Sequence, residues 1–300
     1  MIILGPTGVG KSAAGVFLAG RHHGEIINCD SMQVYRGFDI GTDKPTAEMR
    51  GKVPHHLLDA ADPASQFSAG DFVREAMAAI RLIEGRGRLP FIVGGTGLYL
   101  KALLEGLFPG PGRDIALRRR LEEEAREHGL ESLRRRLEQV DPAYSRLIGA
   151  RDRVRIFRAL EVYILTGKPI SEHFAATKSE TTDFQPLKIG LQLRREELYR
   201  RIEERVERMF QDGIVEETAS LLASGVGEDV PPFRALGYKH VLCFLKKQIS
   251  LREAVERTKT DTRHYAKRQI IWFRKMKGVE WFPAGDHAGL AALVESRLAS

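Results

Sequence analysis

The residues with the clearest chemical potential are the eight at positions 5–12, which read GPTGVGKS. Their spacing fits the phosphate-loop pattern G-x-x-x-x-G-K-[ST], in which glycines let backbone N–H groups turn toward phosphate oxygens. Lys11 adds a full positive charge, and the Ser12 hydroxyl can bind Mg²⁺. The pattern therefore predicts a site for linked phosphates. The residues expected to hold them are Gly5, Thr7, Gly8, Val9, Gly10, Lys11 and Ser12.

Two further segments carry groups that suit the same site. Asp30 follows an apolar run at 25–29, where a carboxylate can act as a general base toward a substrate nucleophile or, alternatively, cap the next turn. The run GGTG at 94–97 permits close backbone approach to a ligand, and the Thr96 hydroxyl can donate to a diphosphate oxygen. An ATPase with a phosphate loop would carry an acidic residue at that strand end, so the glycines argue against ordinary ATP hydrolysis.

The elements around these motifs alternate as in a doubly wound α/β fold. We expect strands at 1–4, 25–29 and 89–93 and helices at 13–19, 68–84 and 98–105. Ser68 is the expected N-cap of the helix at 68–84, with Asp71 three residues later. Because ligands of parallel sheets bind beyond the carboxyl ends of the strands, the loop, Asp30 and Thr96 are expected to meet at one site.

The composition changes at 108–112, where prolines and glycines follow one another. Charged helical patterns then occupy 115–129, 130–140 and 151–166, with no strand signal until about 187. We therefore predict an α/β fold with a P-loop parallel-sheet core in two parts, 1–110 and 185–300, and an all-helical insertion domain at 111–184. The second part is expected to contain strands at 187–193 and 279–282, helices at 195–212 and 214–224, and a basic C-terminal helix at 251–277.

Charge and hydropathy narrow the class of protein. The formal net charge is +7, and between 257 and 277 eight Lys or Arg stand against one acidic residue, with Trp272 and Phe273 interleaved. Such a helix is more typical of a nucleic-acid-binding face than of a merely solvated surface. No run approaches the ~20 apolar residues of a membrane span, and the opening strand leaves no room for a signal peptide. We expect a cytoplasmic monomer with no membrane contact and with Cys29 and Cys243 reduced.

Nine motifs, in order along the chain, resemble those of the tRNA dimethylallyltransferase family. After the phosphate loop they are DSMQVY at 30–35, DIGTDKP at 39–45, PHHLLD at 54–59, FSAGDF at 67–72, GGTGLY at 94–99, RALEV at 158–162, LGY at 236–238 and YAKRQ at 265–269. The resemblance runs to about residue 282. It implies transfer of a dimethylallyl group from dimethylallyl diphosphate to N6 of adenine 37 in the tRNA anticodon stem-loop, with Mg²⁺ assisting and diphosphate leaving.

The resemblance also implies that the insertion domain at 111–184 binds tRNA, and it implies roles for individual residues. Asp30 would accept the proton of the adenine amine, while Lys11, Thr96 and Arg234 would stabilise the leaving diphosphate. The residues implied to bind tRNA are Ser31, Met32, Gln33, Arg118, Arg155, Arg158, Gly237, Tyr238, Lys239, Lys267 and Arg268. The chain departs from the family at Val154, where relatives usually have glutamine, and it has fewer residues before the first strand.

Two other functions remain open at this stage. A phosphate-loop small-molecule kinase would need nucleotide phosphates and a phosphoryl acceptor, and such kinases usually lack a basic helical insertion. A non-catalytic RNA-binding protein with a nucleotide switch would leave the meeting of Asp30 and Thr96 unexplained. ATP turnover without allyl transfer would favour the kinase.

Overall fold

The computed structural model describes residues 1–108, 110–112, 114–176 and 185–299. The chain divides into two compact units, the larger formed by Met1–Ala102 with Phe184–Ser300 and the smaller by Leu103–Asp183. The first division falls within helix α4 (Gly97–Glu105), whereas the sequence placed it after residue 110. The predicted boundary at 184 lies outside the described residues.

The larger unit is built on a parallel sheet, which confirms the predicted α/β fold class. Within the described residues the sheet has six strands in the order β3-β2-β4-β1-β5-β6. They are β1 (Ile2–Leu4), β2 (Gly24–Cys29), β3 (His55–His56), β4 (Leu89–Gly94), β5 (Lys188–Gln192) and β6 (Val279–Pro283). Every pair is parallel. Because β1 lies between β4 and β5, the loop after β1 opens at the middle of the carboxyl edge.

Helices cover this sheet and bury its apolar side chains. Helix α1 (Lys11–Arg21) packs against β1, β2 and β4 and also contacts α2 (Ala47–Lys52) and α14 (His287–Leu298). Helix α3 (Ala69–Glu84) packs against β2 and β4. The Ser68 side chain caps α3 and forms a reciprocal capping box with Asp71, as the sequence predicted.

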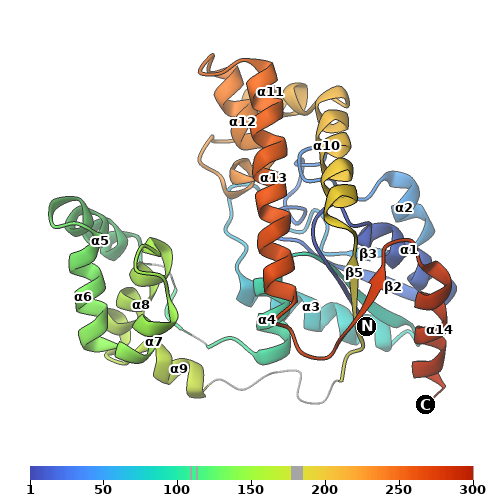
Figure 1. The fold of residues 1–300 in the computed structure, drawn as a ribbon, viewed down its shortest axis with the longest axis horizontal. Coiled ribbons are helices and arrows are strands. Elements are labelled where there is room, and N and C mark those ends of the chain that lie inside the picture. The colour runs from blue at the N-terminus through green and yellow to red at the C-terminus, as the bar shows by residue number, and fades with distance from the viewer. Residues whose placement is uncertain (109, 113, 177–184, 300) are drawn as a thin grey trace. The chain divides into compact units, whose positions relative to one another are not determined.

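Four further helices rise from the carboxyl edge of the sheet (Figure 1). They are α10 (Arg195–Gln211), α11 (Ile214–Ala223), α12 (Leu236–Leu245) and α13 (Leu251–Phe273), and a short 3₁₀ helix η1 (Pro231–Arg234) precedes α12. Helix α13 packs along α10 and α12. The segment after β2 packs onto this group, since Tyr35 and Phe38 share a core with Phe233 and Tyr238. Residues far apart in sequence thus hold the segment that follows Asp30.

The predicted helices and strands of the larger unit are present, with ends shifted by a few residues, and several elements were not predicted. These are α2, β3, η1, α12 and α14. The basic helix α13 is therefore not the C-terminal helix, because β6 and α14 follow it and α14 packs on α1 (Figure 1). The described residues contain no helix that is both long and apolar enough to cross a membrane.

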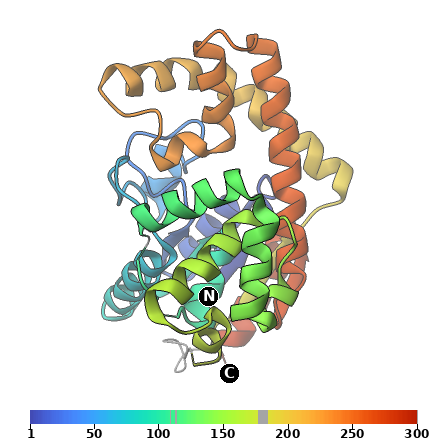
Figure 2. The same cartoon turned by 90° about the vertical axis from the view of Figure 1, so that its left-hand side faces the viewer.

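The smaller unit is helical throughout its described residues, as predicted (Figure 2). Its helices are α5 (Ile115–Glu127), α6 (Leu130–Val140), α7 (Pro142–Leu147), α8 (Arg153–Thr166) and α9 (Ile170–Ala176). The sequence predicted α5, α6 and α8 and missed the two short helices. Leu121, Leu133, Leu137, Ile156 and Leu160 belong to the apolar core that α5, α6 and α8 share.

A buried carboxylate lies in this helical unit. Glu161 is fully buried and accepts hydrogen bonds from both Arg118 Nε and Nη2 at 2.9 Å and from Arg158 Nη1 at 2.8 Å. The Asp114 N–H also donates to it, at 2.9 Å. Burial alone would raise the pKa of Glu161, but these hydrogen bonds outweigh burial and lower it to about 2. Arg118 and Arg158, which the resemblance assigned to tRNA, therefore neutralise an internal charge.

We expect Glu161→Gln to destabilise the helical unit by about 3–5 kcal/mol, because it leaves two partly buried guanidinium groups without their anionic partner. The pKa of Glu161 is lower in the folded state than its ordinary value of 4.5. Its contribution is therefore full above pH ~5 and declines as the pH falls toward 2. Hydrogen exchange of α6 and α8 amides, measured at pH 7 and pH 3, should show a smaller difference between variant and wild type at pH 3. An equal difference at both pH values would contradict the ion-pair account.

Candidate active site

The loop between β1 and α1 has the backbone conformation that its glycines allow. Gly8 and Gly10 adopt φ values of +81° and +97°, in the left-handed region. A Cβ added to Gly5 would lie 2.8 Å from the carbonyl oxygen of Leu191, and one added to Gly8 would lie 3.0 Å from Cγ1 of Ile202. Packing against β5 and α10 thus favours glycine at both positions. Helix α1 begins at Lys11, so its N-terminal N–H groups face the loop region.

A cavity of about 320 Å³ opens beside this loop. The carboxyl ends of β1, β2 and β4 all contribute to it, as the sequence predicted. Its lining includes Thr7, Gly8, Gly10, Lys11, Ser12, Asn28, Asp30, Gln33, Thr42, Asp43, Gly94, Gly95, Arg201, Glu204, Arg205 and Arg208. The cavity therefore combines loop N–H groups, four cationic side chains and three carboxylates.

Lys11 is the cation closest to the loop backbone. Its Nζ donates to the carbonyl oxygen of Pro6 at 2.9 Å. Burial lowers the pKa of Lys11 from 10.5 to about 8, Asp30 acts in the opposite direction, and Arg205 lowers the pKa further. A bound anion would favour the charged ammonium, so Lys11 is set to respond to a phosphate ligand.

Asp30 caps a turn and also lines the cavity. Its Oδ1 accepts hydrogen bonds from the N–H groups of Met32 at 2.8 Å and Gln33 at 3.3 Å. No described residue donates a hydrogen bond to its other oxygen, Oδ2. The capping role that the sequence left as an alternative is therefore real, and it holds the carboxylate in place while Oδ2 stays available to a ligand.

Thr96, just after β4, forms hydrogen bonds with residues at the end of β2. Its Oγ1 accepts a hydrogen bond from the Ser31 N–H at 3.0 Å, and its own N–H donates to the Cys29 carbonyl at 3.2 Å. Thr96 is not among the residues that line the cavity, although Gly94 and Gly95 are. In this structure Thr96 positions the turn that carries Asp30, and its role as a donor to diphosphate stays a prediction.

Gln269 of α13 is a site residue that the sequence analysis did not predict, although it is the last residue of the YAKRQ motif. Its Oε1 accepts from the Thr7 N–H at 2.8 Å, and its Nε2 donates to the Gly95 carbonyl at 2.7 Å. The side chain is buried. The Gln269 amide thus links the phosphate loop to the glycine turn after β4. The Thr7 N–H, which was expected to donate to phosphate, donates to Gln269 in this structure.

The arginines that line the cavity lie on α10. Arg234, which was predicted to stabilise the diphosphate, does not line it. Arg201, Arg205 and Arg208 line the cavity, while Arg234 is exposed on η1 and bonds the Asp229 carbonyl at 3.4 Å. The three arginines recur at intervals of four and three, on the face of α10 next to its buried stripe of Leu198, Ile202, Val206 and Met209. That spacing, on the helix directly after β5, was the signal that could have identified them.

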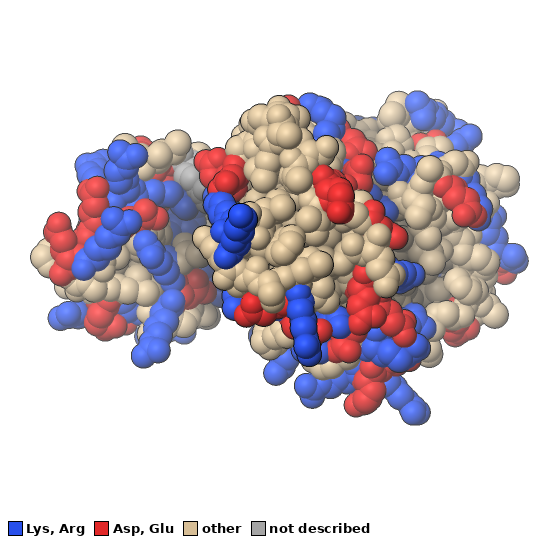
Figure 3. Space-filling view, turned by 90° about the horizontal axis from the view of Figure 1, so that it is seen from above, with Lys and Arg blue, Asp and Glu red and all other residues tan. Residues whose placement is uncertain are grey.

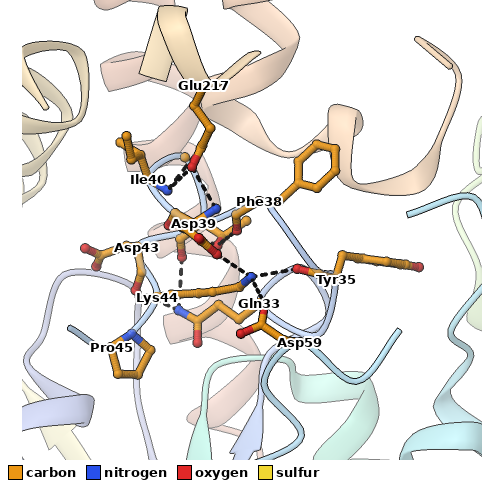
Figure 4. Close-up of polar contacts among 12 residues, drawn as sticks. Gln33, Tyr35, Phe38, Asp39, Ile40, Asp43, Lys44, Pro45, Asp59 and Glu217 are labelled. Atoms are coloured by element: carbon orange, nitrogen blue, oxygen red, sulfur yellow. Dashed lines mark hydrogen bonds and ion pairs between the residues drawn. The ribbon is translucent and has the colours of Figure 1, made fainter. Parts of the chain in front are cut away.

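The segment that follows Asp30 is anchored through the buried side chain of Lys44 (Figure 4). Lys44 Nζ donates to the Tyr35 carbonyl at 2.7 Å and forms ion pairs with Asp39 at 2.6 Å and Asp59 at 2.5 Å. Gln33 Nε2 donates to the carbonyls of Thr42 and Asp43, at 3.0 and 2.8 Å. Gln33, expected to contact RNA, therefore also supports the cavity wall.

Glu217 of α11 binds the same segment from the helical side (Figure 4). It accepts hydrogen bonds from the N–H groups of Asp39 and Ile40 at 3.0 Å. The Tyr238 hydroxyl donates to Glu217 and accepts from the Gly41 N–H at 3.1 Å. Tyr238 is fully buried and Gly237 is buried beside it. These two residues, which the resemblance assigned to tRNA binding, position the segment internally in this structure.

Other residues implied to bind tRNA lie on the surface. Lys267 and Arg268 are exposed on α13, and neither forms an ion pair with a described residue; Arg268 lies 5.8 Å from the ring centre of Tyr265. Lys239 is exposed beside Asp261, at 3.5 Å, and Arg155 pairs with Asp152 at 3.2 Å. Figure 3 shows Lys and Arg interspersed with Asp and Glu over both units. Val154, at the departure from the family, is 73% exposed.

Known proteins resemble this chain over most of its length. The family model described as IPP transferase matches residues 33–276. A tRNA dimethylallyltransferase of Geobacter sulfurreducens is 49% identical over 95% of this chain and 92% of its own, and one of Geotalea uraniireducens is 50% identical over 94% and 91%.

Two solved structures resemble the whole chain. The tRNA isopentenylpyrophosphate transferase of Bacillus halodurans is 40% identical, with a TM-score of 0.72 over 99% of this chain and 94% of its own. A eukaryotic dimethylallyltransferase, described as acting on tRNA, is 31% identical with a TM-score of 0.80 over 99% of this chain and 76% of its own. With identity and fold both matched along nearly all of its length, the chain belongs to the IPP transferase family, that of the tRNA dimethylallyltransferases.

Proposed function

We propose that this protein transfers a dimethylallyl group from dimethylallyl diphosphate to N6 of adenine 37 in tRNA and releases diphosphate. The observation that carries the proposal is the single cavity in which the phosphate loop, Lys11 and the α10 arginines lie beside the carboxylate of Asp30. That cavity offers a site for an anionic leaving group next to a proton acceptor. The names of its relatives favour this function over a kinase.

The leaving group is the first part of the mechanism. Breaking the allylic C–O bond places negative charge on the diphosphate and partial positive charge on carbon. Loop N–H groups, Lys11, Arg201 and Arg205 line the cavity where that negative charge would develop, and fixed cations and N–H dipoles stabilise it without reorganisation. Arg205 is well placed for this role, because its side chain is only 17% exposed and therefore less screened by water.

Asp30 provides the second part. The adenine amine is a weak nucleophile because its lone pair is delocalised into the ring, so loss of its proton must accompany C–N bond formation. Asp30 Oδ2 can accept that proton while Oδ1 keeps its bonds to Met32 and Gln33. The adenine has to leave its stack to reach the cavity, which is inexpensive in an RNA loop.

The donor set of the cavity fits Mg²⁺ bound together with a diphosphate. Among the residues that the structure describes, no group of three or more His, Cys, Asp or Glu could hold a metal by itself. Ser12 nevertheless lines this cavity and offers a hydroxyl oxygen, a ligand that Mg²⁺ takes in combination with substrate phosphates and water. Bound there, Mg²⁺ would neutralise charge on the leaving diphosphate.

The proposal includes an RNA-binding role for the exposed face of α13. We expect Lys267→Gln with Arg268→Gln to reduce the slope of log affinity for tRNA against log salt by about 1–2, because each lost phosphate contact removes roughly one released counterion. Filter binding of tRNA at several salt concentrations measures the slope. Lys246→Gln is the control, since Lys246, which directly follows α12, pairs with Glu228 in the segment between α11 and η1. An unchanged slope in the double variant would remove this face from the interface.

The direct test of function is a transfer reaction. Purified protein is incubated with dimethylallyl diphosphate, Mg²⁺ and unmodified tRNA, and the nucleosides are analysed by mass spectrometry. We expect dimethylallyl adenosine from tRNA with adenine at position 37 and none when that adenine is replaced. ATP consumption without a modified nucleoside would favour the kinase. We also propose that the enzyme acts as a cytoplasmic monomer, with which the free thiols of Cys29 and Cys243 are consistent.

A further inference from the structure

Asp43 forms an ion pair with Arg205, a cavity arginine that is proposed to bind the leaving diphosphate. Arg205 Nη1 donates to Asp43 Oδ2 at 2.9 Å, and both residues line the cavity. Arg205 Nε is buried and has no hydrogen-bond partner among the described residues. A guanidinium binds phosphate best through two parallel N–H groups, and here Asp43 engages one of them.

We propose that Asp43 is an internal competitor for Arg205, which weakens diphosphate binding and promotes release of the diphosphate product. The inference rests on the proposed function, because it takes diphosphate to be the ligand of this cavity. When diphosphate binds, its oxygens take the Arg205 N–H groups and the Asp43 carboxylate turns to solvent. When diphosphate leaves, Asp43 restores the ion pair, so Arg205 is not left unpaired.

The backbone around Asp43 is suited to such an exchange because it stays anchored. Gln33 Nε2 holds the Asp43 carbonyl at 2.8 Å, and the next residue, Lys44, is the buried anchor bound to Asp39 and Asp59 (Figure 4). The Asp43 side chain itself is 51% exposed. The carboxylate can therefore rotate into water while the cavity wall keeps its position.

The charges of the cavity agree with competition. Lys11, Arg201, Arg205 and Arg208 supply four positive charges, and three carboxylates, from Asp30, Asp43 and Glu204, oppose them. Asp30 is the proposed proton acceptor, and Glu204 pairs with Arg200 at 2.7 Å. Asp43 is thus the carboxylate whose partner is a cavity arginine. Without it, the cavity would attract a diphosphate more strongly.

Substitution of Asp43 can be tested without backbone strain. Asp43 has φ +56°, a left-handed conformation that asparagine and glycine both tolerate. Asp43→Asn keeps the shape of the side chain and removes its charge, and Asp43→Gly removes the side chain. If the two variants bind diphosphate with equal affinity, the change from wild type is due to the lost negative charge and not to the new amide group of asparagine.

The experiment is calorimetric titration of inorganic diphosphate with Mg²⁺ into wild type, Asp43→Asn, Asp43→Gly, Arg205→Gln and the double variant Asp43→Asn/Arg205→Gln. We expect both Asp43 variants to bind diphosphate about three- to tenfold more tightly, the range expected for loss of a partly buried competing ion pair. In the Arg205→Gln background, Asp43→Asn should change affinity less than twofold, since the competition requires Arg205.

The outcomes separate the inference from the proposed function. Unchanged or weaker binding by Asp43→Asn, while wild type binds diphosphate, would overturn the inference and leave the function standing. An equal gain with and without Arg205 would also overturn it, since the effect would then be general electrostatics. Absence of diphosphate binding by wild type would overturn both. Product inhibition by diphosphate should strengthen in Asp43→Asn by the same factor as the affinity.

Discussion

The variant Asp30→Asn should lower the rate of dimethylallyl transfer by about 10²–10⁴-fold, the range typical of a lost general base. Asparagine retains an Oδ1 that can accept the Met32 and Gln33 N–H bonds, so the turn after β2 keeps its cap. What it loses is the carboxylate oxygen that takes the proton of the adenine amine. Single-turnover transfer, measured with saturating tRNA and donor, isolates this step.

Asp30→Ala is the matched comparison, because it removes both the base and the cap. If proton transfer is the main role, the alanine variant should be slowed to a similar extent as the asparagine variant. If capping is the main role, the asparagine variant should remain close to wild type and only alanine should be slow. tRNA affinity of Asp30→Asn should stay within about twofold of wild type, and full transfer activity in that variant would exclude Asp30 as the base.

Lys11→Met should reduce transfer by about 10²–10³-fold, the usual effect of removing one fixed group that stabilises developing charge. Methionine approximates the length of lysine without its ammonium. The loss should appear in diphosphate binding as well as in the chemical step, while tRNA affinity changes little. Equal losses in diphosphate and tRNA affinity would indicate a folding defect instead.

The pH dependence of diphosphate affinity tests Lys11 independently. Burial sets the pKa of Lys11 at about 8 in the free protein, and a bound diphosphate should raise it. Affinity should therefore be highest below pH ~8 and fall as the pH rises above it, by up to about tenfold per unit. The ionisation of diphosphate affects wild type and Lys11→Met equally, so its contribution to the pH dependence cancels in the ratio of their affinities. Lys11→Arg should lack this decline, because arginine stays charged, and a parallel decline in all three proteins would contradict the assignment.

Local patterns in the sequence predicted much of the fold. The first strand, its glycine loop and α1, and the Ser68 cap of α3, are determined by short-range rules of apolar runs, glycine conformation and capping. The unpredicted α14 shows the limit. It packs on α1, and its Leu290 and Val294 share an apolar core with Leu18 of α1, but it has few polar residues to mark an exposed face. Its pairing with a helix near the other end of the chain is a tertiary fact that local patterns do not contain.

The same limit applies to the site. Strand ends of a parallel sheet meet by topology, so the loop and Asp30 could be placed in one cavity from sequence alone. The spacing of its arginines marks one face of α10, but the packing of α10 against Gly8, which brings that face to the cavity, is not contained in any local pattern. Tyr238 and Arg118 carry groups that suit RNA, but folding gives them internal partners in Glu217 and Glu161. Residue type indicates what chemistry is available, and burial decides where it is used.

Phosphorus NMR of the complete reaction tests the central claim most directly, that the phosphate loop holds a leaving group in a transfer of carbon. Protein, Mg²⁺, dimethylallyl diphosphate and unmodified tRNA are mixed, and phosphorus products are compared with modified adenine. We predict one inorganic diphosphate for each dimethylallyl adenosine formed, with no orthophosphate and no phosphorylated acceptor. Orthophosphate or a phosphorylated product in place of diphosphate would contradict the account.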